Sequence, residues 1–273
     1  MKFIGMDLGW VSGPSGLCCL SHSDGLHSDG LHSDLSHSDL SHSEDSLVLE
    51  QLDRKDSLED VLTWLDKTTT PEESAIIAVD APTIIPNATG MRLPDRLTHK
   101  YFGKYHAGCY PANLARPFAQ RLVQFGRSLE SRGFSHAPTI HPKQPGRYQI
   151  EVFPHPAMIQ LFGLSRILKY KKGRLAQRQE GLRELRDRLF KKLSSHTPSL
   201  KLDALPEIPT TGKALKDLED KLDSLVCAYV SAYWWYWGKE RCGVLGDRAQ
   251  GYIVIPYPPN APEDLASLKA TSD

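Results

Sequence analysis

Lys2-Phe3-Ile4-Gly5-Met6-Asp7, an apolar strand that ends in an aspartate, is the stretch that decides the fold of this chain. A second apolar run, residues 75–79, also ends in an aspartate, Asp80, and a third, residues 148–153, contains Glu151. A carboxylate at the end of a buried strand is costly to bury alone. These positions therefore indicate a shared cationic partner, and a divalent cation is the usual one.

The elements around these strands predict an α/β fold with a mixed sheet. Residues 2–7, 15–20 and 46–52 read as an antiparallel meander, because Gly9, Gly13 and Pro14 supply a turn between the first two strands. Apolar spacing and turn residues predict the later strands at 75–79, 148–153 and 251–255, and helices at 57–67, 93–103, 156–164, 174–194 and 213–237. Strands and helices in this order indicate a sheet with flanking helices.

The chain reads as a single domain over residues 1–258 with two insertions. Residues 21–45 form a low-complexity hairpin insertion, and residues 82–147 form an insert rich in basic and aromatic side chains. The last residues, 259–273, are expected to be a flexible tail.

Histidines recur every five residues in the first insertion, followed each time by Ser-Asp or Ser-Glu: His22, His27, His32, His37 and His42. A metal-binding tract is one interpretation. A step of five residues gathers side chains on neither a helix nor a strand, so we favour a solvated, disordered loop.

Asp220 and Asp223 lie three residues apart on the last predicted helix and share one of its faces. Two-metal phosphoryl chemistry needs several carboxylates that converge from different elements. Asp7, Asp80 and this helical pair could form such a site.

The sequence Asp7-Leu8-Gly9 also occurs on the first strand of actin-like ATPases and sugar kinases. Those proteins usually add an Asp-Gly-Gly turn and an adenosine-binding Gly-Gly, whereas here the second acidic strand reads Asp80-Ala81-Pro82 and no Gly-Gly pair occurs. No GxxxxGK[ST] loop is present either. The ATP-using interpretation is therefore weaker but stays open.

Several stretches resemble the uncharacterised family of predicted RNase H-like nucleases known as domain of unknown function 429. The matching stretches are Met6-Asp7-Leu8-Gly9-Trp10, Val79-Asp80-Ala81-Pro82, Ile150-Glu151-Val152-Phe153-Pro154, residues 90–96, residues 108–113 and residues 222–229. The resemblance covers most of the chain apart from the histidine repeat, which is an insertion, and the tail. Ser224 stands where many relatives have alanine.

This resemblance implies an RNase H-like fold and a divalent-metal site. The residues carried over as catalytic and metal-binding are Asp7, Asp80, Glu151 and Asp223, and Asp220 resembles an additional helical ligand found in junction resolvases. The implied cofactors are two ions of Mg²⁺ or Mn²⁺. The family's own activity is a prediction, so the resemblance bears on fold more than on substrate.

Two basic regions predict a nucleic-acid partner. Residues 166–192 carry eleven Lys and Arg against three Asp and Glu, and the insert after Asp80 interleaves cations with aromatic rings. The residues expected to contact nucleic acid are Arg92, Arg96, Lys100, Lys104, His106, Lys169, Lys171, Lys172 and Arg174. A solvated helix and a self-packed loop are the ordinary alternatives.

The composition limits the remaining options. The 273 residues have zero formal net charge, so any polyanion site must be a local patch. The five cysteines form no CxxC pair, which disfavours a structural zinc site and is typical of a reduced, cytoplasmic protein. No apolar stretch is long enough for a membrane span, and cleavage of a branched junction would require a homodimer.

The sequence thus predicts a metal-dependent nuclease that cleaves phosphodiester bonds by two-metal hydrolysis. An actin-like or sugar-kinase-like ATPase and a non-catalytic nucleic-acid-binding module of RNase H-like fold are the alternatives. Whether DNA, RNA, a hybrid or a junction is the substrate stays open.

Overall fold

The computed structural model describes residues 1–22 and 46–259. The strands are β1 (Lys2–Asp7), β2 (Ser15–His22), β3 (Ser46–Lys55), β4 (Ala75–Val79), β5 (Ser135–His136), β6 (Arg147–Glu151), β7 (Ser199–Lys201), β8 (Cys242–Asp247) and β9 (Gly251–Pro256). The helices are α2 (Leu58–Thr68), α3 (Leu93–Phe102), α4 (Ala119–Glu130), α5 (Pro154–Phe162), α6 (Leu175–Leu193) and α7 (Gly212–Trp237), with short 3-10 turns η1 (Gly103–Tyr105) and η2 (Gly238–Glu240).

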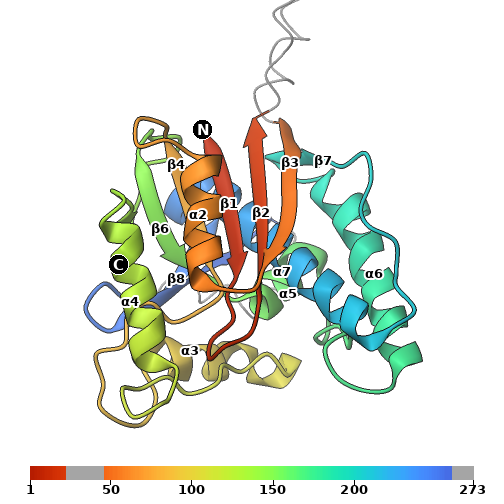
Figure 1. Cartoon of the computed structure of the whole chain (residues 1–273), viewed down its shortest axis with the longest axis horizontal. Helices are drawn as coiled ribbons and strands as arrows, with labels where there is room; N and C mark the ends of the chain where they lie inside the picture. The colour runs from red at the N-terminus through yellow and green to blue at the C-terminus, as the bar shows by residue number, and fades with distance from the viewer. Residues whose placement is uncertain (23–45, 260–273) are drawn as a thin grey trace, which may run out of the picture.

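A seven-stranded mixed sheet in the order β5-β6-β4-β1-β2-β3-β7 forms the centre of the molecule (Figure 1). The meander β1–β2–β3 is antiparallel, whereas β4 pairs parallel to β1 and β6 pairs parallel to β4. The mixed α/β architecture, the meander and the flanking helices predicted from sequence are confirmed. Because β1, β4 and β6 are parallel, their carboxyl ends meet at one edge of the sheet, the lower edge in Figure 1.

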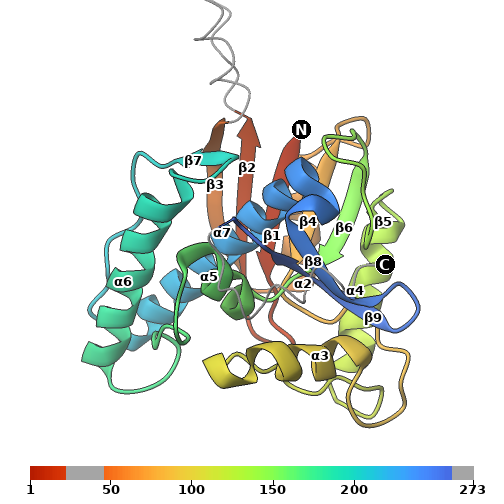
Figure 2. The same cartoon turned by 180° about the vertical axis from the view of Figure 1, so that it is seen from behind.

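Helices cover both faces of the sheet (Figures 1 and 2). Alternate strand residues supply two separate cores, as the two-residue period of a strand requires. In β1, Phe3 belongs to the core beneath α5, α6 and α7, whereas Ile4 and Met6 belong to the core beneath α2 and α4. β4 divides in the same way, with Ile76 and Ala78 on the α7 side.

Two strand glycines bring α7 unusually close to the sheet. A Cβ added at Gly5 would overlap the Ser224 carbonyl oxygen, and one added at Gly16 would overlap the Asp220 carbonyl oxygen. The helix backbone therefore lies directly on β1 and β2, where no larger side chain fits. This close packing positions the acidic turn of α7 beside the carboxyl end of β1.

The structure adds elements that the sequence analysis did not predict. Besides the predicted helix at 93–103, the second insertion contains α4, which buries Leu122, Phe125 and Leu129 against the sheet. β7 lies between α6 and α7, and β8 pairs with the predicted last strand to form a separate hairpin. Most of the histidine repeat, residues 23–45, and the tail from residue 260 lie outside the described residues.

Along the described parts of the chain, no helix combines the length and the apolar character that a membrane crossing requires. The five cysteines are free thiols, and four of them are buried.

Candidate functional site

Asp7 and Asp80 lie side by side at the carboxyl ends of two neighbouring parallel strands. Met6 pairs with Val79 in the β1–β4 register, and the Asp80 backbone N–H donates to the Met6 carbonyl at 2.8 Å. The ladder thus continues one residue past β4 and fixes the two aspartates as neighbours. This adjacency follows from the parallel pairing and was anticipated from the sequence.

Asp223 of α7 completes the group from the helix side. Its carboxylate is fully buried. The Tyr170 hydroxyl donates to its Oδ1 at 2.7 Å, and the Lys171 ammonium lies 2.6 Å from its Oδ2. Tyr170 and Lys171 belong to the segment between α5 and α6, so four separate parts of the chain meet here.

The carboxylates of Asp7 and Asp80 are notable for what they lack. Within residues 1–22 and 46–259, neither forms a hydrogen bond or an ion pair through its side chain. Among the described residues, none donates a hydrogen bond to Asp223 Oδ2, and Lys171 is the only cation that pairs with it. Charged carboxylates rarely stay unpaired in partly buried surroundings, so Asp7 and Asp80 are groups that take up either a proton or a cation.

The pKa values of Asp7, Asp80 and Lys171 are all shifted by burial and by the charges of their neighbours. Burial raises the pKa of Asp7 well above its ordinary value, and Asp223 and Asp80 raise it further against the opposing effect of Lys171. Burial also raises the pKa of Asp80 to about 7, again opposed by Lys171. Burial by itself would lower the pKa of Lys171, yet the surrounding acids raise that pKa well above its ordinary value.

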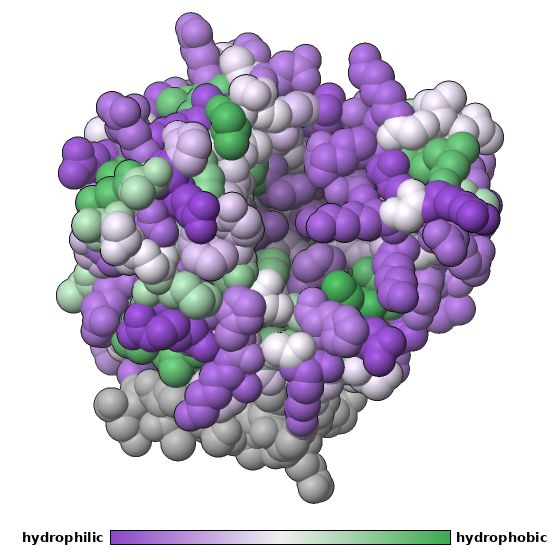
Figure 3. Space-filling model, turned by 90° about the horizontal axis from the view of Figure 1, so that it is seen from below, coloured by the Kyte–Doolittle hydropathy of each residue, from purple (hydrophilic) through white to green (hydrophobic). Residues whose placement is uncertain are grey.

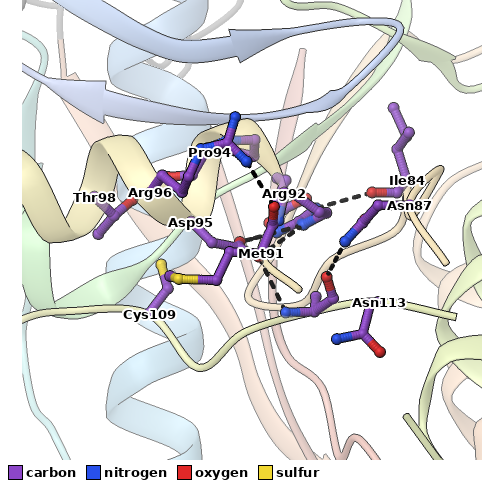
Figure 4. Close-up of polar contacts among 12 residues, drawn as sticks. Ile84, Asn87, Met91, Arg92, Pro94, Asp95, Arg96, Thr98, Cys109 and Asn113 are labelled. Atoms are coloured by element: carbon purple, nitrogen blue, oxygen red, sulfur yellow. Dashed lines mark hydrogen bonds and ion pairs between the residues drawn. The ribbon is translucent and has the colours of Figure 1, made fainter. Parts of the chain in front are cut away.

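Glu151, by contrast, has a dedicated partner. The Arg92 guanidinium binds it with two hydrogen bonds of 2.7 and 2.8 Å, and the same guanidinium contacts Asp95 at 2.8 Å. All three side chains are at most 5% exposed. Figure 4 shows Arg92 beside Asp95 at the start of α3, with a further hydrogen bond to the Ile84 carbonyl.

Burial and the Arg92 charge act in opposite directions on the protonation of Glu151. Burial raises the pKa of Glu151 to about 7, and the Arg92 charge and hydrogen bonds act to lower it. Asp80 lies close enough that Glu151 raises its pKa. Glu151 therefore borders the site while its carboxylate oxygens are already occupied.

Asp220 is likewise paired within the chain. Its carboxylate lies 2.8 Å from the Lys216 ammonium and 3.3 Å from Arg54 Nε. Asp220 raises the pKa of Asp7, which places it within electrostatic reach. The structure thus brings Asp7, Asp80 and Asp223 together with Lys171, and it leaves Glu151 and Asp220 at the border with their own cations.

A small cavity of about 40 Å³ opens beside Asp80 and Glu151. Asp80 and Glu151 line it together with Trp10, Tyr110 and Phe153. The Trp10 indole N–H donates to the Asp80 carbonyl at 3.1 Å, which holds this wall in place. The cavity has room for about one or two water-sized groups.

The donor set suits a hard divalent cation, because such ions prefer carboxylate oxygens. The side-chain oxygens of Asp7 and Asp80, which have no partner among the described residues, fit such an ion, and the cavity adjoins them on the Asp80 side. In the described part of the chain, no group of three or more His, Cys, Asp or Glu side chains is already arranged to hold a metal. The carboxylates therefore lie near one another, but their oxygens are not arranged as a complete coordination shell.

The predicted nucleic-acid contacts divide into two groups. Arg92 is buried in its ion pairs, and the ammonium of Lys171, whose side chain is 30% exposed, is paired with Asp223. The others are exposed: Arg96, Lys100, Lys104, His106, Lys169, Lys172 and Arg174. The Ile167 N–H donates to the Tyr105 carbonyl at 3.1 Å, which brings the two basic segments into contact.

Two residues at the site were missed by the sequence analysis. Tyr170 is fully buried against Asp223, although it stands within a basic run that reads as surface. His155 follows Glu151 by four residues, and its ring lies 5.8 Å from the Tyr170 ring with a buried, unpartnered Nδ1. Only the position of His155 just after an acidic strand would have drawn attention to it.

The raised pKa of Asp80 predicts a pH dependence of the metal-free protein. Between pH 8.5 and 6 the folded state gains a proton that the unfolded state, with an ordinary aspartate, does not bind. Stability therefore rises as the pH falls through about 7, by about 1 kcal/mol for one such group. Thermal melts in chelator should show this gain in wild type relative to Asp80→Asn.

Two buried histidines have the opposite effect on stability as the pH falls, and the comparison with Asp80→Asn removes their contribution. Burial lowers the pKa of His155 and of His136 to about 4, so both histidines cost stability as the pH falls below about 6.5. They do so equally in both proteins. An unchanged difference between wild type and variant across this range would contradict the pKa assigned to Asp80.

Comparison with known proteins gives one match. The model of a family described as a protein of unknown function, DUF429, matches residues 14–250. The chain belongs to this family, as the resemblance noted in the sequence implies. No curated protein and no solved structure matches the chain.

Proposed function

We propose that this DUF429 protein is a divalent-cation-dependent nuclease that hydrolyses phosphodiester bonds of nucleic acid with Mg²⁺ or Mn²⁺. One observation carries the proposal: the unpaired carboxylates of Asp7 and Asp80 meet Asp223 at the carboxyl edge of the sheet. Three acids from three elements, with oxygens free on one side, favour cation-assisted phosphoryl chemistry over a structural role.

In the proposed nuclease, each residue of the site has a separate role. Asp7, Asp80 and Asp223 would hold the cation, and the Tyr170 hydroxyl orients the Asp223 carboxylate. A bound cation supplies an activated water and stabilises charge on the leaving oxygen. The Arg92–Glu151 pair forms a rigid border that keeps the Asp80 side of the site in place.

The surface around the site suits a polyanion. The face seen from below in Figure 3, toward which β1 and β6 point in Figure 1, is hollowed near its centre, and mainly hydrophilic residues line the hollow. Exposed cations on α3–η1 and on the segment before α6 lie on connected elements. Phosphate contacts from such cations would give affinity that falls steeply with salt.

The RNase H-like fold is part of the same proposal. The antiparallel meander β1–β3, the parallel strands β4 and β6, and a long helix that carries an acid to the end of β1 support it. In this arrangement the acids expected from the resemblance fall at one sheet edge.

A substrate panel tests the function. We expect full-length protein with Mn²⁺ to cleave at least one of a labelled single strand, duplex, RNA–DNA hybrid and four-way junction, and chelator to abolish cleavage. The substrate that is cut identifies the substrate class. The matched inactive control is Asp223→Asn, which keeps the side-chain shape and removes the charge.

The alternatives give different results in the same series. An ATP-using enzyme would be stabilised by ATP with Mg²⁺ beyond the effect of Mg²⁺ alone. A binding module would retain salt-sensitive strand binding and cleave nothing. Either result, obtained with folded wild-type protein, would overturn the nuclease proposal.

A further inference from the structure

The acids of the site fall into two classes by their partners. Glu151 is bound by Arg92, and Asp220 is bound by Lys216 and Arg54. For Asp7, Asp80 and Asp223, Lys171 is the one cation of the described chain that pairs with the group directly. Only Asp7, Asp80 and Asp223 are therefore available to a ligand from solution.

Lys171 is held in this position by its surroundings. The preceding residue, Tyr170, is fully buried, and its hydroxyl and its carbonyl bind Asp223 and Arg178 respectively, at 2.7 and 3.3 Å. Gly181 of α6 lies directly on the Lys169 carbonyl, where a Cβ would overlap it. The Lys171 ammonium is therefore a fixed charge, whereas the neighbouring Lys172 is exposed.

The charges of this group favour one divalent ion. Three carboxylates carry three negative charges when ionised, and Lys171 neutralises one, which leaves two for a cation from solution. While Lys171 stays in place, a second divalent ion would need Glu151 or Asp220 to give up its partner. The Arg92–Glu151 pair is almost fully buried, so its separation would leave an uncompensated charge in the interior.

We infer that the site binds a single divalent cation and that the Lys171 ammonium occupies the place of a second. This inference rests on the proposed cation site and replaces the two ions that the sequence predicts. In this arrangement Lys171 supplies the positive charge that a second ion would otherwise bring to the phosphate or to the bridging carboxylates.

Counting bound Mn²⁺ tests the inference without any assay of cleavage. Full-length wild type, Lys171→Met, Lys171→Arg and the exposed control Lys172→Met are titrated with Mn²⁺, and free Mn²⁺ is followed by its EPR signal. The same titration of Asp7→Asn defines binding elsewhere on the chain, including the histidine repeat, and is subtracted.

We expect one Asp7-dependent ion in wild type, Lys171→Arg and Lys172→Met, and two in Lys171→Met, where the second carboxylate-bound position becomes free. Two ions in wild type would overturn the inference and leave the nuclease proposal intact. One ion in folded Lys171→Met would also overturn it. No Asp7-dependent ion in wild type would overturn both proposals together, and the wild-type count decides even if Lys171→Met does not fold.

Discussion

Replacing Asp7 by asparagine is expected to abolish cleavage while the protein stays folded and becomes no less stable. The substitution removes one of the two unpaired carboxylates that would hold the cation, so the rate should fall by at least about 10³-fold. Burial and three neighbouring acids raise the pKa of Asp7. Removing this charge therefore relieves repulsion in the metal-free state, and the melting temperature in chelator should stay level or rise.

The measurement pairs single-turnover cleavage with thermal melts in chelator and in Mn²⁺. Asp203→Asn is the matched control, because Asp203 is exposed and lies away from the site on the connector before α7. It should change neither rate nor melting temperature. Residual activity of Asp7→Asn within tenfold of wild type would show that the chemistry occurs elsewhere.

Replacing Arg92 by methionine is expected to cause the largest loss of stability. Arg92 is the shared partner of Glu151 and Asp95, and all three side chains are almost fully buried. Without the guanidinium, two carboxylates remain in the interior without a cation, which typically costs about 3–5 kcal/mol. Urea denaturation measures the change in the free energy of unfolding.

Two further variants establish the cause. Arg96→Met removes an exposed arginine with one hydrogen bond, to the Met91 carbonyl, and should stay within about 0.5 kcal/mol of wild type. The double variant Arg92→Met with Glu151→Gln should recover part of the loss, since the unpaired charge is removed. A loss below about 1 kcal/mol for Arg92→Met would contradict this account of the buried network.

The sheet and its acidic edge were predictable because local patterns encode them. A run such as Ala75–Val79 is apolar at every position, as a strand covered on both faces requires. Two such runs ending in aspartate place both acids at one edge once the strands pair in parallel. The apolar runs predict the strands, and parallel pairing of these strands then places both aspartates at the same edge of the sheet.

The partners of the acids were not predictable, because packing between distant segments chooses them. Arg92 and Lys171 both read as surface cations from composition, yet one closes a buried triad and the other enters the acidic site. Nothing in the local pattern distinguishes Lys171 from Lys172. The difference arises from Tyr170, whose burial against α7 turns one lysine inward and leaves the next outside.

The helix α4 was not predicted from the sequence, for a different reason. Its apolar positions Leu122, Phe125 and Leu129 follow helical spacing, but the sequence analysis assigned no element to residues 119–129 of the insert. The signal was present in the periodicity and was outweighed by the composition of the flanking segments. Burial of α4 against the sheet explains why the helix forms there.

The central claim is that Asp7, Asp80 and Asp223 bind a divalent cation at the carboxyl edge of the sheet. Anomalous diffraction from crystals of the full chain soaked in Mn²⁺ tests it most directly. The account predicts an anomalous peak in contact with these three carboxylates, absent from Asp7→Asn crystals under the same conditions. Well-ordered wild-type crystals with no peak there, or with a peak that persists in Asp7→Asn, would contradict it.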